Sequence, residues 1–312
     1  MRFAKYHGTK NDFVVIEDLD AAMDLPPELL AAICDRHGGV GADGTIRVVR
    51  GDAAFAAGLC GPEQAHTDFF MDYANADGAP AEMCGNGIRC LGAFAYGRGL
   101  TARTELDVGT RDGIKHLSLR VEEGVVVAVT VDMGTPSVQL ASLPMAGDSD
   151  ATFLQQPYQV DGRTYLASAV SMGNPHLVLF LEPNEDLRAV DVARLGSIIE
   201  HRPEFPERTN VEFVQVVDDS EIHMRVWERG SGLTLACGTG ACAVLVAAAL
   251  AGRTRRSATV EVPGGTLSVT WGEDGRVLLT GSATRVFDGE LSPGWLARHG
   301  TWTPAAVQGS RP

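Results

Sequence analysis

Basic residues are scarce in this sequence. Its 26 Lys and Arg residues are outnumbered by 40 Asp and Glu residues, which gives a net charge of -14 at pH 7. No stretch of Lys and Arg is dense enough to follow a phosphate backbone, so nucleic acid is not an expected partner. Arg2, Lys5 and Lys10 interrupt the apolar run that a secretory signal would need. We therefore expect a cytoplasmic protein.

Long apolar runs are rare as well. Gly230 to Gly252 carries no charged residue and is long enough to span a bilayer. Many of its residues are Gly, Ala or Thr and few are strongly apolar, which favours a small-residue helix buried inside a soluble protein. No membrane partner is expected.

The cysteines lack the spacings of common metal and redox sites. None of the six forms a CxxC pair, and the closest pairs, Cys84 with Cys90 and Cys237 with Cys242, do not match the knuckles of structural zinc sites. Without an export signal, free reduced thiols are expected instead of disulfides. We predict no metal site.

Short strand-like segments dominate the chain. Asp107 to Asp132 alternates apolar and polar residues around Glu123-Gly124 and predicts a hairpin. Further strands are expected at residues 159–160, 169–170, 177–181, 211–217, 223–227, 258–262, 267–271 and 276–280. Helices are expected at residues 27–36, 87–97, 190–200 and 240–250.

An internal repeat is the most informative feature. Met83-Cys84-Gly85-Asn86-Gly87 is echoed by Ala236-Cys237-Gly238-Thr239-Gly240, and each copy leads into an Ala-rich helix. A weaker echo pairs residues 11–15 with residues 174–178. The repeat predicts two similar halves, residues 1–132 and 133–283, with a strand near 284–291 that returns to the first half. The tail, residues 292–312, is expected to be partly helical and to end in disorder.

Each repeat places a cysteine at a helix N-terminus, where the helix dipole is expected to lower the thiol pKa. The N–H groups beside the glycines are also suited to bind a carboxylate. One such element is typical of a buried structural cysteine. Two in matching registers predict a catalytic pair, because inversion of a carbon needs one group to remove a proton from one face and a second to deliver a proton to the other. This chemistry needs neither metal nor pyridoxal phosphate.

Several polar residues lie in expected loops near these elements. Taken singly, each Asn is typical of a turn, but together they indicate a site that binds carboxylate and ammonium groups. Arg229 is suited to a carboxylate, and Glu228 to an ammonium or to tuning a proton. His176 is either structural or a neighbour that shifts a thiol pKa. The set is Asn11, Asn75, Asn174, Asn210, Glu228 and Arg229.

These motifs resemble the diaminopimelate epimerase family over about residues 1 to 291. The resemblance is carried by Gly8-Thr9-Lys10-Asn11-Asp12-Phe13, Asn75-Ala76-Asp77-Gly78, both cysteine motifs, Gly173-Asn174-Pro175-His176, Thr209-Asn210-Val211 and Glu228-Arg229-Gly230. It implies an α/β fold of two pseudo-symmetric halves, each a curved, mostly antiparallel sheet around a central helix, with the active site in the cleft between them. It also implies a homodimer that works without a cofactor.

The same resemblance assigns roles to residues. Cys84 and Cys237 are the implied catalytic pair, with His176 and Glu228 tuning their protonation. Gly85, Asn86, Gly238 and Thr239 would hold the reacting α-carboxylate, and Asn11, Asn75, Asn174, Asn210 and Arg229 would bind the distal end of L,L-diaminopimelate as it is converted to the meso isomer for lysine and peptidoglycan precursors. Two features depart from the family pattern: Gly44 stands where many members have Gln, and residues 51–67 form a longer segment.

Three other functions stay open at this point. A two-cysteine proline or hydroxyproline racemase would use the same proton chemistry, although a compact imino acid has no second charged end for the Asn cluster and Arg229 to bind. A thiol redox protein would join Cys84 and Cys237 in a disulfide, but the missing CxxC motif argues against it. A binding module without catalysis is the third.

Overall fold

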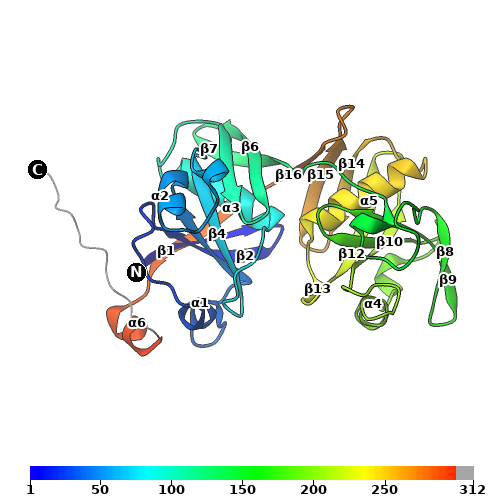
Figure 1. Cartoon of the computed structure of the whole chain (residues 1–312), viewed down its shortest axis with the longest axis horizontal. Coiled ribbons are helices and arrows are strands. Elements are labelled where there is room, and N and C mark those ends of the chain that lie inside the picture. Colours follow the sequence, from blue (N-terminus) through cyan, green and yellow to red (C-terminus); the bar gives the residue numbers. More distant parts are fainter. Residues whose placement is uncertain (300–312) are drawn as a thin grey trace, which may run out of the picture. The chain divides into compact units, whose positions relative to one another are not determined.

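The computed structural model describes residues 1–299. These residues form two compact units, one comprising Met1–Val131 with the residues from Ser282 onward, the other Asp132–Gly281. Figure 1 shows the N-terminal part of the first unit in blue to cyan and the second unit in green to orange. Residues 300–312, where the tail was expected to be disordered, lie outside the described residues.

The sheet of the first unit has two parallel strand pairs, β2–β3 and β4–β5, and antiparallel pairs elsewhere. A helix, α1 (Pro27–Cys34) or α3 (Gly85–Gly97), connects the strands of each parallel pair. The strand order is β17 (Thr284–Glu290), β1 (Arg2–Gly8), β2 (Asn11–Glu17), β3 (Gly44–Val49), β4 (Phe69–Asn75), β5 (Glu105–Thr110), β6 (Gly113–Glu122) and β7 (Val125–Asp132). The longer segment after β3 forms α2 (Gly51–Ala56) and a 3₁₀ turn at Pro62–Gln64.

The second unit repeats this topology. Its parallel pairs are β10–β11 and β12–β14, connected through α4 (Val192–Glu200) and α5 (Gly238–Leu250). The strand order is β8 (Gln156–Val160), β9 (Arg163–Ser171), β10 (Pro175–Phe180), β11 (Asn210–Val216), β12 (Glu221–Glu228), β14 (Ser257–Val262), β15 (Gly265–Trp271) and β16 (Val277–Gly281). The short strand β13 (Gly232–Thr234) pairs with the end of β12.

Each sheet curves around one buried helix. All α3 residues from Gly85 to Ala95 are buried, and α3 contacts strands from β17 to β6. Nearly all of α5 is buried against the strands from β9 to β16. The predicted fold class, two similar α/β halves with a central helix, is therefore confirmed.

The uncharged segment from Gly230 to Gly252 is largely α5, in which every residue from Gly240 to Ala248 is buried in the second unit. A helix that is apolar all round needs this kind of burial. Within residues 1–299, no helix is long and apolar enough to cross a membrane.

The four expected helices are present, with shifted ends. Both α3 and α5 begin two residues earlier than expected, so that Cys84 and Cys237 themselves occupy the N-cap positions. The hairpin turn falls at Glu123-Gly124, where both residues have positive φ, as a tight hairpin requires. The tail contains α6 (Pro293–His299).

The packing of α4 on β12 generates a stability prediction. A Cβ atom added at Gly196 would lie 2.3 Å from Cβ of Trp227, whereas one added at Gly294 in α6 would meet open space. We expect Gly196→Ala to lower the free energy of unfolding by roughly 1 to 3 kcal/mol through overpacking. Gly294→Ala should leave it unchanged or raise it by up to about 1 kcal/mol. Urea unfolding of both variants measures this, and equal stabilities would contradict the packing.

Candidate active site

Cys84 caps the N-terminus of α3 in extended conformation, with φ -133° and ψ 118°. Its half-buried Sγ lies 3.6 Å from Oδ1 of Asn11, at the start of β2. Asn86 in the first turn donates from Nδ2 to the same Asn11 oxygen at 3.2 Å. The first N–H groups of a helix have no intrahelical acceptor. The corner formed by the N-cap Cys84 and the first turn of α3 therefore offers N–H donors to an anion beside a thiol.

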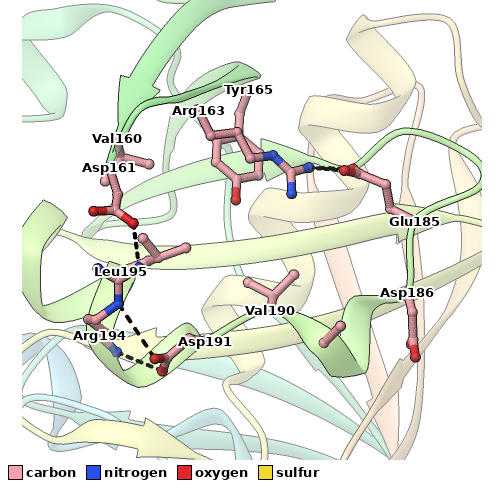
Figure 2. Close-up of a pocket in the computed structure, with 11 residues that line it drawn as sticks. Val160, Asp161, Arg163, Tyr165, Glu185, Asp186, Val190, Asp191, Arg194 and Leu195 are labelled. Atoms are coloured by element: carbon pink, nitrogen blue, oxygen red, sulfur yellow. Dashed lines mark hydrogen bonds and ion pairs between the residues drawn. The ribbon is translucent and has the colours of Figure 1, made fainter.

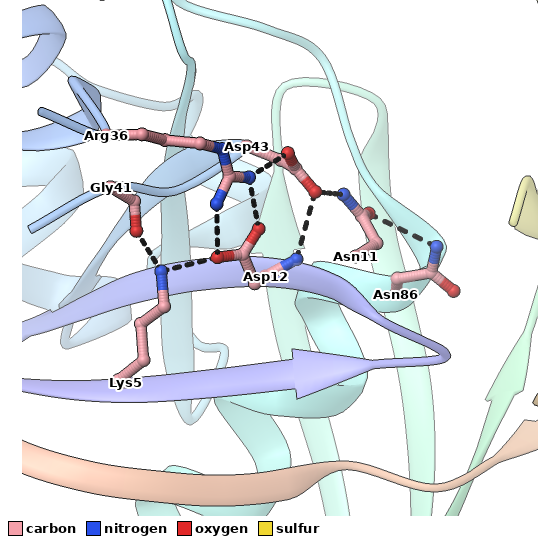
Figure 3. A network of polar contacts seen from close by, with 7 residues as sticks. All are labelled: Lys5, Asn11, Asp12, Arg36, Gly41, Asp43 and Asn86. Atoms are coloured by element: carbon pink, nitrogen blue, oxygen red, sulfur yellow. Dashed lines mark hydrogen bonds and ion pairs between the residues drawn. The ribbon is translucent and has the colours of Figure 1, made fainter. Parts of the chain in front are cut away.

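A network of charged residues fixes the Asn11 amide (Figure 3). Asn11 donates from Nδ2 to Oδ2 of Asp43 at 2.7 Å, which directs its oxygen toward Cys84 and Asn86. Arg36 bridges Asp43 and Asp12 at 2.7 and 2.8 Å. The buried Lys5 contacts Asp12 at 2.6 Å and donates to the carbonyl of Gly41. Asp43, which the sequence analysis did not select, is therefore the residue that orients Asn11.

Asn75 ends β4 with an exposed side chain. The hydroxyl of Tyr73 donates to its Oδ1 at 3.0 Å, which leaves the amide N–H₂ group to face a ligand. Gly44 is paired with Asn75 in the sheet, and a Cβ at Gly44 would lie 2.7 Å from the Tyr73 ring. The Tyr73 ring therefore occupies the space beside Gly44 that a larger residue would need.

Cys237 caps α5 in the same extended conformation, with φ -124° and ψ 119°. Its Sγ accepts a hydrogen bond from the N–H of Gly240 at 3.3 Å and lies 3.4 Å from Oγ1 of Thr239. Asn174 donates from Nδ2 to the Thr239 hydroxyl at 3.4 Å. The two cysteine motifs therefore build equivalent corners, one in each unit.

His176 lies in the core of the second unit and is 1% exposed. Its Nδ1 is 2.7 Å from Oε1 of Glu212, and its Nε2 is 3.0 Å from Oδ1 of Asn174. Glu212 was not selected from the sequence. It lies two residues beyond Asn210 on β11, and a carboxylate between the apolar residues Val211 and Phe213 was the signal that could have identified it.

The expectation of a lowered thiol pKa is wrong for Cys237. Burial raises its pKa well above the usual value, and the carboxylates of Glu228 and Glu212 raise it further. The hydrogen bonds from Thr239 and from the N–H of Gly240 act in the opposite direction but are outweighed. Burial also raises the pKa of Glu228, whose carboxylate accepts a hydrogen bond from Thr234.

Asn210 and Arg229 are joined to one another. Oδ1 of the buried Asn210 accepts from the backbone N–H of Arg229 at 2.9 Å, and its Nδ2 donates to the carbonyl of Pro175 at 2.8 Å. The exposed Arg229 donates from Nη1 to the carbonyl of Glu207 at 3.3 Å. Asn210 thus holds the loop that presents Arg229.

No group of three or more His, Cys, Asp or Glu side chains within residues 1–299 is arranged to hold a metal ion. A cavity of about 410 Å³ in the second unit contains none of the predicted site residues. It is lined by ion pairs, Arg163 with Glu185 and Arg194 with Asp161 and Asp191, as Figure 2 shows. Since its guanidinium groups already have carboxylate partners, this cavity is not our candidate site.

The structure thus collects the predicted residues into two sets. Asn11, Cys84, Gly85 and Asn86 meet at the start of α3, with Asn75 at the end of β4 in the same unit. Asn174, His176, Cys237, Gly238 and Thr239 meet at the start of α5, and Asn210 with Glu228 and Arg229 lies at the adjoining ends of β11 and β12.

The family model of diaminopimelate epimerase matches residues 3–139 and 168–286 of the chain. The chain belongs to the diaminopimelate epimerase family. It is 42% identical over 292 residues to the diaminopimelate epimerase of Acetivibrio thermocellus, covering 93% of this chain and 98% of that protein. It is 45% identical over 294 residues to that of Desulfitobacterium hafniense, with the same coverage of both chains.

Solved structures with this fold include more distant proteins. A probable proline racemase from Agrobacterium radiobacter matches with a TM-score of 0.66 and 13% identity, covering 94% of this chain and 93% of that one. A hydroxyproline epimerase from Agrobacterium vitis matches with a TM-score of 0.63 and 14% identity, covering 93% and 90%. At this identity the likeness concerns the fold alone. The relatives that are 40 to 45% identical to this chain are diaminopimelate epimerases.

The charged network of this family member predicts a pH effect. Burial alone would raise the pKa of Asp12, but hydrogen bonds from Arg36 and Lys5 lower it to about 2. A carboxyl whose pKa is lower in the folded state stabilises the fold above its unfolded pKa of about 4, and this contribution is lost as the pH falls toward 2. Between pH 4 and 2 the wild type should lose about 2 kcal/mol more than Asp12→Asn.

Urea unfolding at several pH values measures this difference. Asp20→Asn, which removes a carboxylate from an exposed ion pair with Arg50, is the control and should follow the wild type. Parallel pH dependence of the wild type and Asp12→Asn would contradict the assigned role of Asp12.

Proposed function

We propose that this protein interconverts L,L-diaminopimelate and meso-diaminopimelate with Cys84 and Cys237 as the two acid–base groups. The observation that carries the proposal is the repetition of the corner in two units of the same topology. In each unit a cysteine caps the helix that the sheet encloses, and the backbone N–H groups that follow the cysteine lie at or beside glycines. The membership of the chain in the diaminopimelate epimerase family supports this substrate.

The reaction breaks and remakes one bond between carbon and hydrogen. One cysteine, as thiolate, takes the α-proton from one face of the carbon and becomes a thiol. The other cysteine, as thiol, delivers its proton to the opposite face and becomes a thiolate, so that the reverse reaction runs with the roles exchanged. Chemically, both sulfur atoms must reach the same α-carbon.

Charge develops on the substrate while the α-carbon lacks its proton. The N–H groups in the first turns of α3 and α5 would bind the α-carboxylate and stabilise this charge. Gly85 and Asn86 supply them in one unit, and Gly238 and Thr239 in the other. Glycines at these positions keep side chains away from the bound carboxylate.

The distal end of the substrate bears a second ammonium and a second carboxylate. Arg229 is exposed and suited to bind this carboxylate, and Asn75 offers an amide whose oxygen Tyr73 already occupies. Asn11, Asn174 and Asn210 would complete the binding residues, and the carboxylate of Glu228 would attract an ammonium or tune Cys237. A compact imino acid lacks these distal groups, which favours diaminopimelate over proline.

Replacing one cysteine should separate the two halves of the reaction. We expect Cys84→Ala and Cys237→Ala each to abolish epimerisation, because one face of the carbon loses its proton donor or acceptor. The remaining thiolate should still exchange the α-hydrogen of the stereoisomer whose proton faces it, so the two variants should prefer opposite isomers. Deuterium incorporation from heavy water into the L,L and meso isomers, measured separately, checks this.

Matched controls lie in the same helices. Cys90 in α3 and Cys242 in α5 are fully buried, and Cys90→Ala and Cys242→Ala should remain active once folded. Substantial epimerisation by Cys84→Ala or Cys237→Ala would refute the two-base proposal.

Arg229→Ala tests binding of the distal carboxylate. Loss of a charge-assisted partner should reduce kcat/KM by an amount equivalent to about 2 to 5 kcal/mol. Arg255→Ala, which removes an exposed arginine paired with Asp219 in the same unit, is the control and should behave like the wild type. Near-native kcat/KM in a folded Arg229→Ala protein would assign Arg229 a structural role.

We further propose that the enzyme is a cytoplasmic homodimer that needs no cofactor, as the resemblance implies. Sedimentation of the purified protein tests the homodimer, and fractionation of native cells tests the location. A monomer or a membrane-bound protein would contradict these two statements. Activity of the protein after exhaustive dialysis against a chelator tests the third, that no cofactor is needed.

A further inference from the structure

A buried histidine and a buried glutamate contact one another beneath the first turn of α5. The side chains of His176, on β10, and Glu212, on β11, are both 0% exposed, and Nδ1 of His176 is 2.7 Å from Oε1 of Glu212. A Cβ atom added at Gly240 would lie 2.7 Å from the same Glu212 oxygen and 3.3 Å from Sγ of Cys237. Glu212 therefore packs directly against the helix turn that holds Cys237.

The second oxygen of Glu212 is unusual. Oε2 is buried and has no hydrogen-bond partner within the described part of the chain. Leaving a buried carboxylate oxygen unpaired costs free energy that folding alone does not require. Such a group suggests a role other than stability.

In the first unit, apolar residues occupy the positions equivalent to His176 and Glu212. Phe13 pairs with Gly44 in β2–β3 as His176 pairs with Asn210 in β10–β11, so Phe13 is the counterpart of His176. By the same register, Ile46 is the counterpart of Glu212.

The helix contacts agree with this correspondence. A Cβ added at Gly87 would meet Cδ1 of Ile46 at 3.1 Å, and one at Gly240 would meet Oε1 of Glu212. Phe13 and Ile46 are fully buried and apolar, so the fold itself is satisfied by an apolar pair here. The pair of His176 and Glu212 therefore occurs beneath the cysteine of the second unit and not beneath that of the first.

We propose that Glu212, held by His176, is a positioning residue that keeps the proton on Cys237 in the resting enzyme, so that Cys237 begins the reaction as the donor. The inference rests on the proposed function and adds that Cys237 is the thiol that carries the proton in the resting enzyme. The charged or titratable groups that act on Cys237 are Glu212 from β11 and Glu228 from β12, with His176 from β10 between Glu212 and Asn174.

The consequence follows from electrostatics. Two carboxylates near a buried sulfur oppose a thiolate there, and both raise the pKa of Cys237. Once Cys237 has given up its proton, its thiolate is correspondingly a stronger base, which suits removal of an α-proton in the reverse direction.

The test measures the ionisation of Cys237 without substrate. The protein is treated with iodoacetamide between pH 6 and 11, and carboxamidomethylation of the Cys237 and Cys84 peptides is quantified by mass spectrometry. In Glu212→Gln, removal of the carboxylate should increase the alkylation rate of Cys237 about tenfold at a pH below its wild-type midpoint. The Cys84 peptide serves as the internal reference and should not change.

Two variants control for a structural effect. Glu212→Asp keeps the charge and should stay near the wild-type profile, while Glu200→Gln alters another buried glutamate of the same unit and should leave Cys237 unchanged. If Glu212→Gln fails to fold, the double variant His176→Phe with Glu212→Ile reproduces the apolar pair of the first unit and should also accelerate alkylation of Cys237.

An unchanged Cys237 profile in folded Glu212→Gln, or in the folded double variant, overturns the proposal, and so does an equal shift in Glu200→Gln. These outcomes are distinct from failure of the proposed function, because alkylation does not depend on epimerisation. Wild-type epimerisation of L,L-diaminopimelate, assayed separately, decides that question.

Discussion

Both candidate thiols depend on one constraint: a helix whose first turn contains two glycines and packs directly on a sheet. A Cβ at Gly87 would lie 3.1 Å from Ile46 and Met71, and one at Gly240 would lie 2.7 Å from Glu212. Any larger residue would push the helix away from the strands. Because the turn packs this closely, the cysteine at the N-cap and the N–H groups that follow it are positioned by the core itself. The binding corner is therefore as rigid as the packing beneath it.

Repetition of the unit allows equivalent positions to carry different chemistry. Gly44 pairs with Asn75 on β4, and Asn210 pairs with Glu228 on β12 by the same register. One unit thus presents an amide where the other presents a carboxylate. The space at Gly44 is filled by the Tyr73 ring, whose hydroxyl orients Asn75. A carbon with four different substituents needs unlike surroundings on its two faces, and a duplicated scaffold with unlike side chains can supply them.

The sequence predicts the elements of this fold better than the contacts between them. The echo of the cysteine motifs predicts two similar halves and helices that begin beside Cys84 and Cys237, since those features are local. Asp43, Tyr73 and Glu212 were missed because their roles depend on contacts with segments distant in the sequence. Asp43 meets Asn11 from a loop, the Tyr73 ring packs beside Gly44, and Glu212 meets His176 from the neighbouring strand. The pKa of Cys237 was mispredicted for the same reason. The helix dipole is visible in the sequence, whereas the carboxylates that oppose it come from β11 and β12.

Unequal thiols are compatible with a reversible reaction. The ratio of the two isomers at equilibrium is a property of the substrates, so no arrangement of side chains around Cys237 can change it. In the proposed mechanism, what the surroundings change is the free enzyme, which carries its proton on one cysteine or on the other. Each form would accept only the isomer whose α-hydrogen faces its thiolate. Glu212 with His176 beneath one thiol and an apolar pair beneath the other would populate one form over the other at rest. On the proposed mechanism, the difference between His176 with Glu212 and Phe13 with Ile46 would therefore set which isomer the resting enzyme is prepared to bind, while the chemistry at the carbon would remain the same in both directions.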